Sequence, residues 1–95
     1  MVVVMVMSIV SLKLDGADLV EALQAAAQKV EAMEGDMILD FSSVGRVTPA
    51  ALSAMSDFAD TADERSVNVV LRGVNVDVYR VLKLARLAQR LSLVS

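Results

Sequence analysis

Short apolar runs alternate with longer amphipathic stretches along this chain, and this order is the feature that most constrains its fold. The runs MILDF (37–41) and VNVVLR (67–72) have the length and apolar content of buried strands. The first run, MVVVMVMSIVSL (1–12), fits one long strand or a hairpin of two, with Ser8 as the break. Strands that alternate with helices predict a mainly parallel central sheet with helices packed against it, joined by right-handed crossovers. We therefore expect the α/β class and a single domain over residues 1–95.

The first amphipathic stretch is predicted to be a helix that begins at Asp18. Asp18 and Glu21 have the spacing of a capping box, in which side chains satisfy the free N–H groups of the first turn. Gly35 is expected to end this helix, because glycine adopts the left-handed conformation that helix C-termini favour. Its predicted core-facing residues recur at helical spacing: Leu19, Leu23, Ala26, Val30 and Met33.

The only proline of the chain marks the start of the second predicted helix. Thr48 precedes it as the expected N-cap, and Pro49 fits the first helical position, where its missing N–H costs nothing. Asn75 is the expected N-cap of a third helix, which follows the strand at 67–72. The predicted core-facing residues of the second helix are Leu52, Met55, Phe58, Ala59 and Ala62.

Composition excludes several kinds of chemistry. The chain has no cysteine and no histidine, which rules out disulfides, thiolate nucleophiles, zinc sites with Cys or His ligands, and Ser-His relays. Asp40, at the end of a predicted strand, has no second catalytic partner in the sequence. We expect it to hydrogen-bond the loop that follows, rather than to act as a general base or metal ligand. The sequence therefore predicts no catalytic residue, no cofactor and no metal.

Charge and hydropathy also limit the partners. A net charge of −3 and three aromatic residues argue against nucleic-acid binding. The first twelve residues are uncharged, yet they are too short to span a bilayer and lack the basic region and cleavage site of a signal peptide. We expect a cytoplasmic protein without direct membrane insertion, the alternative being a membrane-seeking segment at 1–12. As an unpaired sheet edge, the same segment is able to join two copies in a homodimer.

The elements from Met37 to Val94 resemble the STAS-domain family, which includes bacterial anti-sigma factor antagonists and the tails of sulfate transporters. The resemblance rests on MILDFSSVGRV, on the helix opened by TPAAL, on the strand VNVVLRGVN and on the helix VYRVLKLARL. The stretch LDGADLVEALQAAAQKV (14–30) is similar to the family's first helix region. Within the family, LRGVNVDVYRVLKL looks most similar to the small STAS subunits of Mla-type phospholipid ABC transporters.

The resemblance implies a degenerate phosphorylation site. The family motif at the start of the second helix runs from an acidic residue through hydroxyl or small residues to glycine and leucine. It aligns with TPAAL (48–52), and only the leucine is kept. The phosphoacceptor position holds Pro49, which has no hydroxyl group. Thr48 and Ser43 are substitutes, with Ser42 beside the latter, but capping and turn formation are the ordinary roles of these residues. We therefore expect the phosphorylation switch to be missing.

The resemblance further implies a non-catalytic interaction module that binds a nucleotide-binding protein. Our first hypothesis is a regulator of the anti-sigma factor antagonist type, which binds an anti-sigma factor or serine kinase constitutively. The alternative is an accessory subunit that docks on the ATPase of a phospholipid ABC transporter. The expected contact surface is the start of the second helix, where small side chains permit close approach, although Ala50 is also simply a good helix former. This surface comprises Arg46, Thr48, Pro49, Ala50, Ser53 and Asp57.

A basic set near the C-terminus consists of Arg80, Lys83, Arg86 and Arg90. We expect these residues to form a solvated face that complements a helix dipole, rather than an anion-binding site. The family usually has glycine or asparagine at the position of Arg86, so the resemblance leaves open where the third helix ends.

Overall fold

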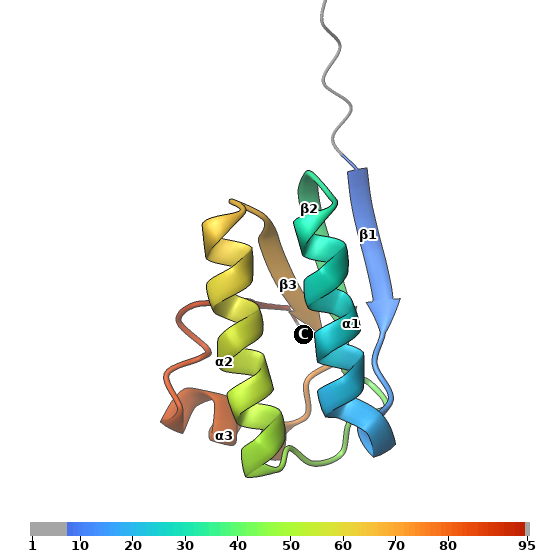
Figure 1. Cartoon of the computed structure of the whole chain (residues 1–95). Helices are drawn as coiled ribbons and strands as arrows, with labels where there is room; N and C mark the ends of the chain where they lie inside the picture. Colours follow the sequence, from blue (N-terminus) through green and yellow to red (C-terminus); the bar gives the residue numbers. More distant parts are fainter. Residues whose placement is uncertain (1–7, 95) are drawn as a thin grey trace, which may run out of the picture.

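The computed structural model describes residues 8–94, in which strands and helices alternate (Figure 1). The strands form one parallel sheet in the order β1-β2-β3-β4, which confirms the predicted α/β class. Each connection between neighbouring strands contains a helix, as parallel pairing requires. The elements are β1 (Ser8–Lys13), α1 (Leu19–Glu31), β2 (Gly35–Asp40), α2 (Pro49–Glu64), β3 (Asn68–Arg72), α3 (Val76–Leu84) and β4 (Ser92–Val94), and a short 3-10 helix, η1 (Gly16–Asp18), precedes α1.

Two predictions concern the N-terminal run. The choice between one long strand and a hairpin, and the pairing of two copies through that strand, depend on residues 1–7 and lie outside the described residues. Of the helices between residues 8 and 94, none combines the length and the hydrophobicity that a membrane span requires.

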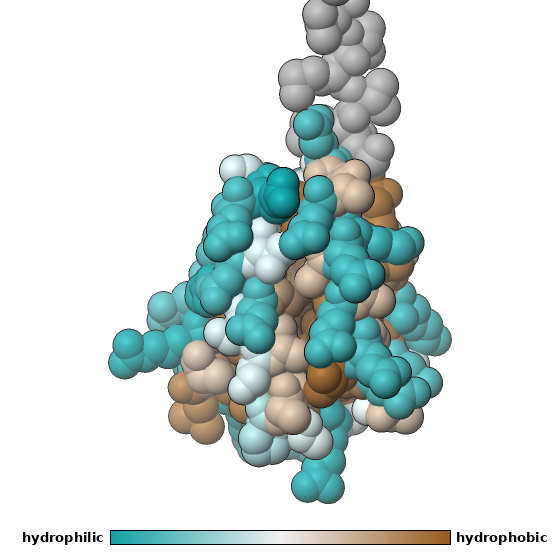
Figure 2. Space-filling view, viewed as in Figure 1, coloured by the Kyte–Doolittle hydropathy of each residue, from teal (hydrophilic) through white to brown (hydrophobic). Residues whose placement is uncertain are grey.

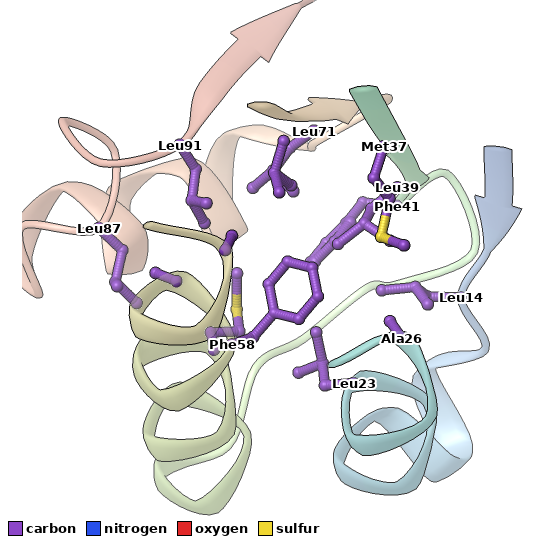
Figure 3. Close-up of a cluster of buried hydrophobic side chains, with 14 of the residues drawn as sticks. Leu14, Leu23, Ala26, Met37, Leu39, Phe41, Phe58, Leu71, Leu87 and Leu91 are labelled. Atoms are coloured by element: carbon purple, nitrogen blue, oxygen red, sulfur yellow. The ribbon is translucent and has the colours of Figure 1, made fainter. Parts of the chain in front are cut away.

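Helices α1 and α2 lie side by side against the sheet (Figure 1). Side chains of β2 alternate between the two faces of the sheet: Met37 and Leu39 are fully buried, whereas Ile38 and Asp40 are only partly buried. Phe58 extends from α2 into the centre of the core (Figure 3). The helix residues predicted to face the core are buried, apart from the partly buried Met33 and Leu52. The helical periodicity therefore identified the core-facing sides of both helices.

Two predictions about the first helix are wrong. The capping box does not form, because a 3-10 turn precedes α1 and Asp15 caps that turn by accepting the N–H of Ala17 at 3.0 Å. Asp18 occupies the N-cap position of α1 but makes no side-chain cap hydrogen bond. The helix ends at Glu31, and Gly35, with a φ of 110°, opens strand β2 instead.

The C-terminal part contains a strand that the sequence did not predict. Helix α3 ends at Leu84, and Arg86 follows in the left-handed region with a φ of 61°. The N–H of Arg86 donates to the carbonyl of Lys83 at 3.1 Å, and that of Leu87 to the carbonyl of Leu82 at 2.9 Å. These are the two hydrogen bonds of a Schellman motif, so Arg86 takes the place that glycine usually has. After this turn the chain reaches β4, which pairs with β3 at the sheet edge.

Candidate functional site

The start of α2 is built as the sequence predicted. Thr48 has extended backbone angles, and its Oγ1 accepts the N–H of Ala51 at 3.2 Å. Pro49 occupies the first helical position. The threonine hydroxyl accepts the otherwise free N–H of Ala51, and Pro49 has no N–H group. Neither Ala51 nor Pro49 therefore leaves a backbone donor that needs another partner.

The loop before α2 is held between two glycines from neighbouring turns. A Cβ atom on Gly16 would lie 3.1 Å from the backbone oxygen of Ser43. A Cβ atom on Gly73 would lie 3.2 Å from the backbone nitrogen of Ser42, and Gly73 also has a φ of 74°. Larger residues at either glycine would push the loop outward. Close backbone packing therefore fixes where α2 begins.

Asn75 ties the same loop to α3. Its Oδ1 accepts the N–H of Val78 at 2.8 Å, which confirms the predicted N-cap. Its Nδ2 donates to the carbonyl oxygens of Val44 at 3.2 Å and Gly45 at 3.4 Å. One side chain thus caps α3 and holds the loop that leads into α2.

Asp40 stabilises the first residues of this loop, as the sequence predicted. Its Oδ1 accepts the backbone N–H of Ser42 at 2.8 Å. Hydrogen bonding from Ser42 lowers the pKa of Asp40, and the nearby cations Lys13 and Arg72, which flank it in register on β1 and β3, act in the same direction. The ionised form is therefore favoured, which suits a loop anchor better than a proton acceptor. Within residues 8–94, no group of three or more potential metal-ligating side chains gathers.

The six residues predicted to contact a partner all lie exposed around the first turns of α2. Arg46 and Thr48 line a hollow that is closed on the other side by the start of α1. Ala50, Ser53 and Asp57 line a groove between α1 and α2. Their role in binding stays a prediction. We call the set the α2 surface, and its members are Arg46, Thr48, Pro49, Ala50, Ser53 and Asp57.

The sequence prediction missed the other wall of the groove. Val20, Gln24 and Ala27 of α1 line it, and they recur at the spacing of one helical face. Figure 2 shows near-neutral and apolar residues along the line between α1 and α2, with hydrophilic residues on both sides. The helical repeat was visible in the sequence, but only the packing of α1 on α2 shows that these residues face Ser53.

The four basic residues near the C-terminus do not form one face. Arg90 lies beyond α3, and its guanidinium donates to Asp60 at 2.6 Å and to Asp63 at 2.9 Å, both on α2. These hydrogen bonds raise the pKa of Arg90. Arg80 and Lys83 are exposed on α3, and Arg86 is exposed in the turn after it. The expectation of one solvated face is therefore wrong for Arg90, which ties the C-terminal segment to α2.

Comparisons with solved structures identify the class of fold. A sulfate transporter family protein from Wolinella succinogenes superposes with a TM-score of 0.77 at 17% identity, covering 93% of this chain and 76% of that one. The protein TM1081 superposes with a TM-score of 0.75 at 18% identity, covering 92% of this chain and 74% of that one. Together with the parallel sheet and its helices, these likenesses show that the chain shares the fold of both proteins, as the resemblance implied.

Sequence comparison gives more particular relatives. The chain is similar to the intermembrane phospholipid transport system binding protein MlaB of Escherichia coli and to that of Shigella flexneri. Each is 39% identical over 57 residues, which are 60% of this chain. The match spans 59% of the length of each relative. No family model matches the chain.

Proposed function

We propose that this protein is a non-catalytic accessory module of a phospholipid transport system, which docks on the ATPase of the transporter. The observation that carries the proposal is the 39% identity to MlaB, a phospholipid transport system binding protein. This relationship favours the transport hypothesis over the anti-sigma factor antagonist hypothesis. Because the ATPase of such a transporter lies on the cytoplasmic side of the membrane, we propose a cytoplasmic location for this protein as well.

The shape of the α2 surface supports a docking role. Ala50 and Ser53 are small and exposed beside the groove between α1 and α2, so a partner helix can approach the backbone closely. Arg46 and Asp57 stand at opposite ends of the surface, where charged side chains set the register of a partner. Buried residues of α2, Met55 and Phe58 among them, fix the helix beneath this surface.

The proposed docking is constitutive. Pro49 stands where the family carries a phosphoacceptor, and it has no hydroxyl to modify. The hydroxyl of Thr48 is engaged in the cap, and Ser43 lies in the loop packed against Gly16. A phosphate on either residue would add about two negative charges beside the surface, so its absence keeps the surface available.

Affinity purification of the full chain from its native cells tests the proposal. We expect the ATPase of a phospholipid transport system to co-purify, and the recovered chain to carry no phosphate at Thr48 or Ser43. Ser53→Arg should reduce recovery of the ATPase about 100-fold, because a long side chain would fill the groove (about 3 kcal/mol). Ala25→Arg, exposed on the side of α1 away from the groove, is the matched control and should bind as the native chain does. Recovery of a serine kinase or a sigma-regulating protein in place of the ATPase would contradict the proposal.

A further inference from the structure

The cationic side chains of this acidic protein are concentrated in its last third. From residue 65 to the C-terminus the sequence has six Lys and Arg and a single carboxylate side chain, Asp77. Residues 1–64 have three Lys and Arg and eleven Asp and Glu. Such a separation of charge creates a local positive potential despite the net charge of −3. Arg90 is paired with α2, and three of the other five cations lie on α3 and in its C-terminal turn.

Helix α3 combines these cations with exposed apolar side chains. Val78 and Leu82 are buried and attach the helix to the core. On the opposite side, Val76 is 65% exposed, Tyr79 42% and Leu84 85%. Figure 2 shows hydrophobic residues at the surface at the lower left, where Figure 1 places α3. We call this the α3 face, and it consists of Val76, Tyr79, Arg80, Lys83 and Leu84, with Arg86 directly after the helix.

The cations of the α3 face are not used within the described part of the protein. Between residues 8 and 94, no ion pair or hydrogen bond engages the side chains of Arg80, Lys83 or Arg86. All three residues are exposed. Solubility accounts for the exposed cations, because scattered charges keep a surface soluble. It does not account for Leu84 and Tyr79, which are exposed between them.

We propose that the α3 face binds an acidic segment of a partner protein. Carboxylates of the segment would pair with Arg80, Lys83 and Arg86. Apolar side chains of the segment would cover Tyr79 and Leu84. Tyrosine and arginine are enriched at the contact centres of protein interfaces, and opposite charges steer such partners together.

The arrangement of the residues favours a protein over a membrane. A helix that lies on a bilayer has one continuous apolar side flanked by cations. On α3 the cations Arg80 and Lys83 lie among the apolar residues, and the carboxylate of Asp77 is exposed beside Val76. Anionic lipid headgroups would repel that carboxylate, whereas a protein partner can place a donor next to it.

Site-specific photo-cross-linking in the native cell tests this proposal. A photo-reactive phenylalanine analogue replaces Leu84 in the full chain, and the same analogue at Ala25, exposed on the side of α1 away from the groove, is the control. We expect Leu84 to cross-link to a protein segment rich in Asp and Glu, identified by mass spectrometry of the joined peptides. Replacing both cations, Arg80→Glu with Lys83→Glu, should reduce this product about tenfold, because two attractive charge pairs become repulsive. Circular dichroism checks that the double variant is folded.

Each other outcome would overturn the proposal. Cross-linking no stronger than at Ala25 would show that no partner covers this face. A product with a second copy of the chain, or with a segment lacking acidic residues, would show a different kind of contact. Flotation with phosphatidylglycerol vesicles that depends on Arg80 and Lys83 would assign the face to a membrane. An analogue at Ser53 reports separately on the α2 surface, so failure of the ATPase docking and failure of this proposal can be told apart.

Discussion

Helix α2 is attached to the core by five buried side chains over 16 residues, and α3 by two over nine. The exposed surfaces of the two helices also differ in the size and charge of their side chains. The α2 surface is made largely of small side chains beside a groove, whereas the α3 face has large apolar and cationic side chains. A firmly packed helix can offer binding through shape, because its backbone position is fixed. A lightly attached helix depends more on charge, which tolerates small displacements.

The largest expected effect comes from removing the buried side chains that attach α2 and α3 to the core. Phe58→Ala should lower the free energy of unfolding by about 4 kcal/mol, because it removes a large side chain from the centre of the core. Leu82→Ala beneath α3 should cost less, about 2–3 kcal/mol. Urea denaturation followed by circular dichroism measures both losses. Tyr79→Ala, which is exposed, is the control and should stay within about 0.5 kcal/mol of the native chain. Equal losses for Phe58→Ala and Leu82→Ala would show that α3 is attached as firmly as α2.

An intermediate effect is expected from the two N-caps. Thr48→Ala should cost about 1 kcal/mol, the value of a single cap hydrogen bond. Asn75→Ala should cost about 2 kcal/mol, because Asn75 also holds the carbonyls of Val44 and Gly45. Asn75→Asp keeps the acceptor for the N–H of Val78 but loses the donor to the loop carbonyls. Its stability should therefore lie between that of the native chain and that of Asn75→Ala. Thermal unfolding measures all three variants. If Asn75→Ala cost no more than Thr48→Ala, the link to the loop would add nothing to stability.

The smallest effect concerns how the helices end. Ser66 and Arg86 follow α2 and α3 with φ values of 56° and 61°, a conformation that suits glycine best. Ser66→Gly and Arg86→Gly should therefore each stabilise the protein by about 0.5–1 kcal/mol, measured by denaturant unfolding. Only Arg86→Gly should also weaken cross-linking at Leu84. A loss of stability in Arg86→Gly alone would mean that its side chain supports the fold.

Most of the fold could be predicted from the sequence, because its helix caps and its hydrophobic periodicity are clear. The N-caps Thr48 and Asn75 and the periodicity of α1 and α2 follow from residue type and spacing. Strand β4 could not be predicted, since three residues have no period and their pairing with β3 is a long-range contact. The capping box failed for a similar reason: the alternative cap Asp15 acts only once the 3-10 turn has formed.

The candidate site was predicted in part. The residues of the α2 surface share one helix, so helical geometry alone brings them together. The α1 wall of the groove and the pairing of Arg90 with Asp60 and Asp63 depend on contacts between distant segments. Periodicity shows which side of a helix faces inward, but it does not show which neighbour the helix meets.

Asn75 has a consequence for how two partners would share this protein. Its amide joins the loop at Val44 and Gly45, which leads into the α2 surface, to the first turn of α3. A partner that shifts the loop must therefore stretch or release the hydrogen bonds that orient α3. By thermodynamic linkage, if a partner bound at the α2 surface changes the affinity of the α3 face, a partner bound at the α3 face changes the affinity of the α2 surface by the same factor. This side chain is where two binding events on a small domain would become cooperative or competitive.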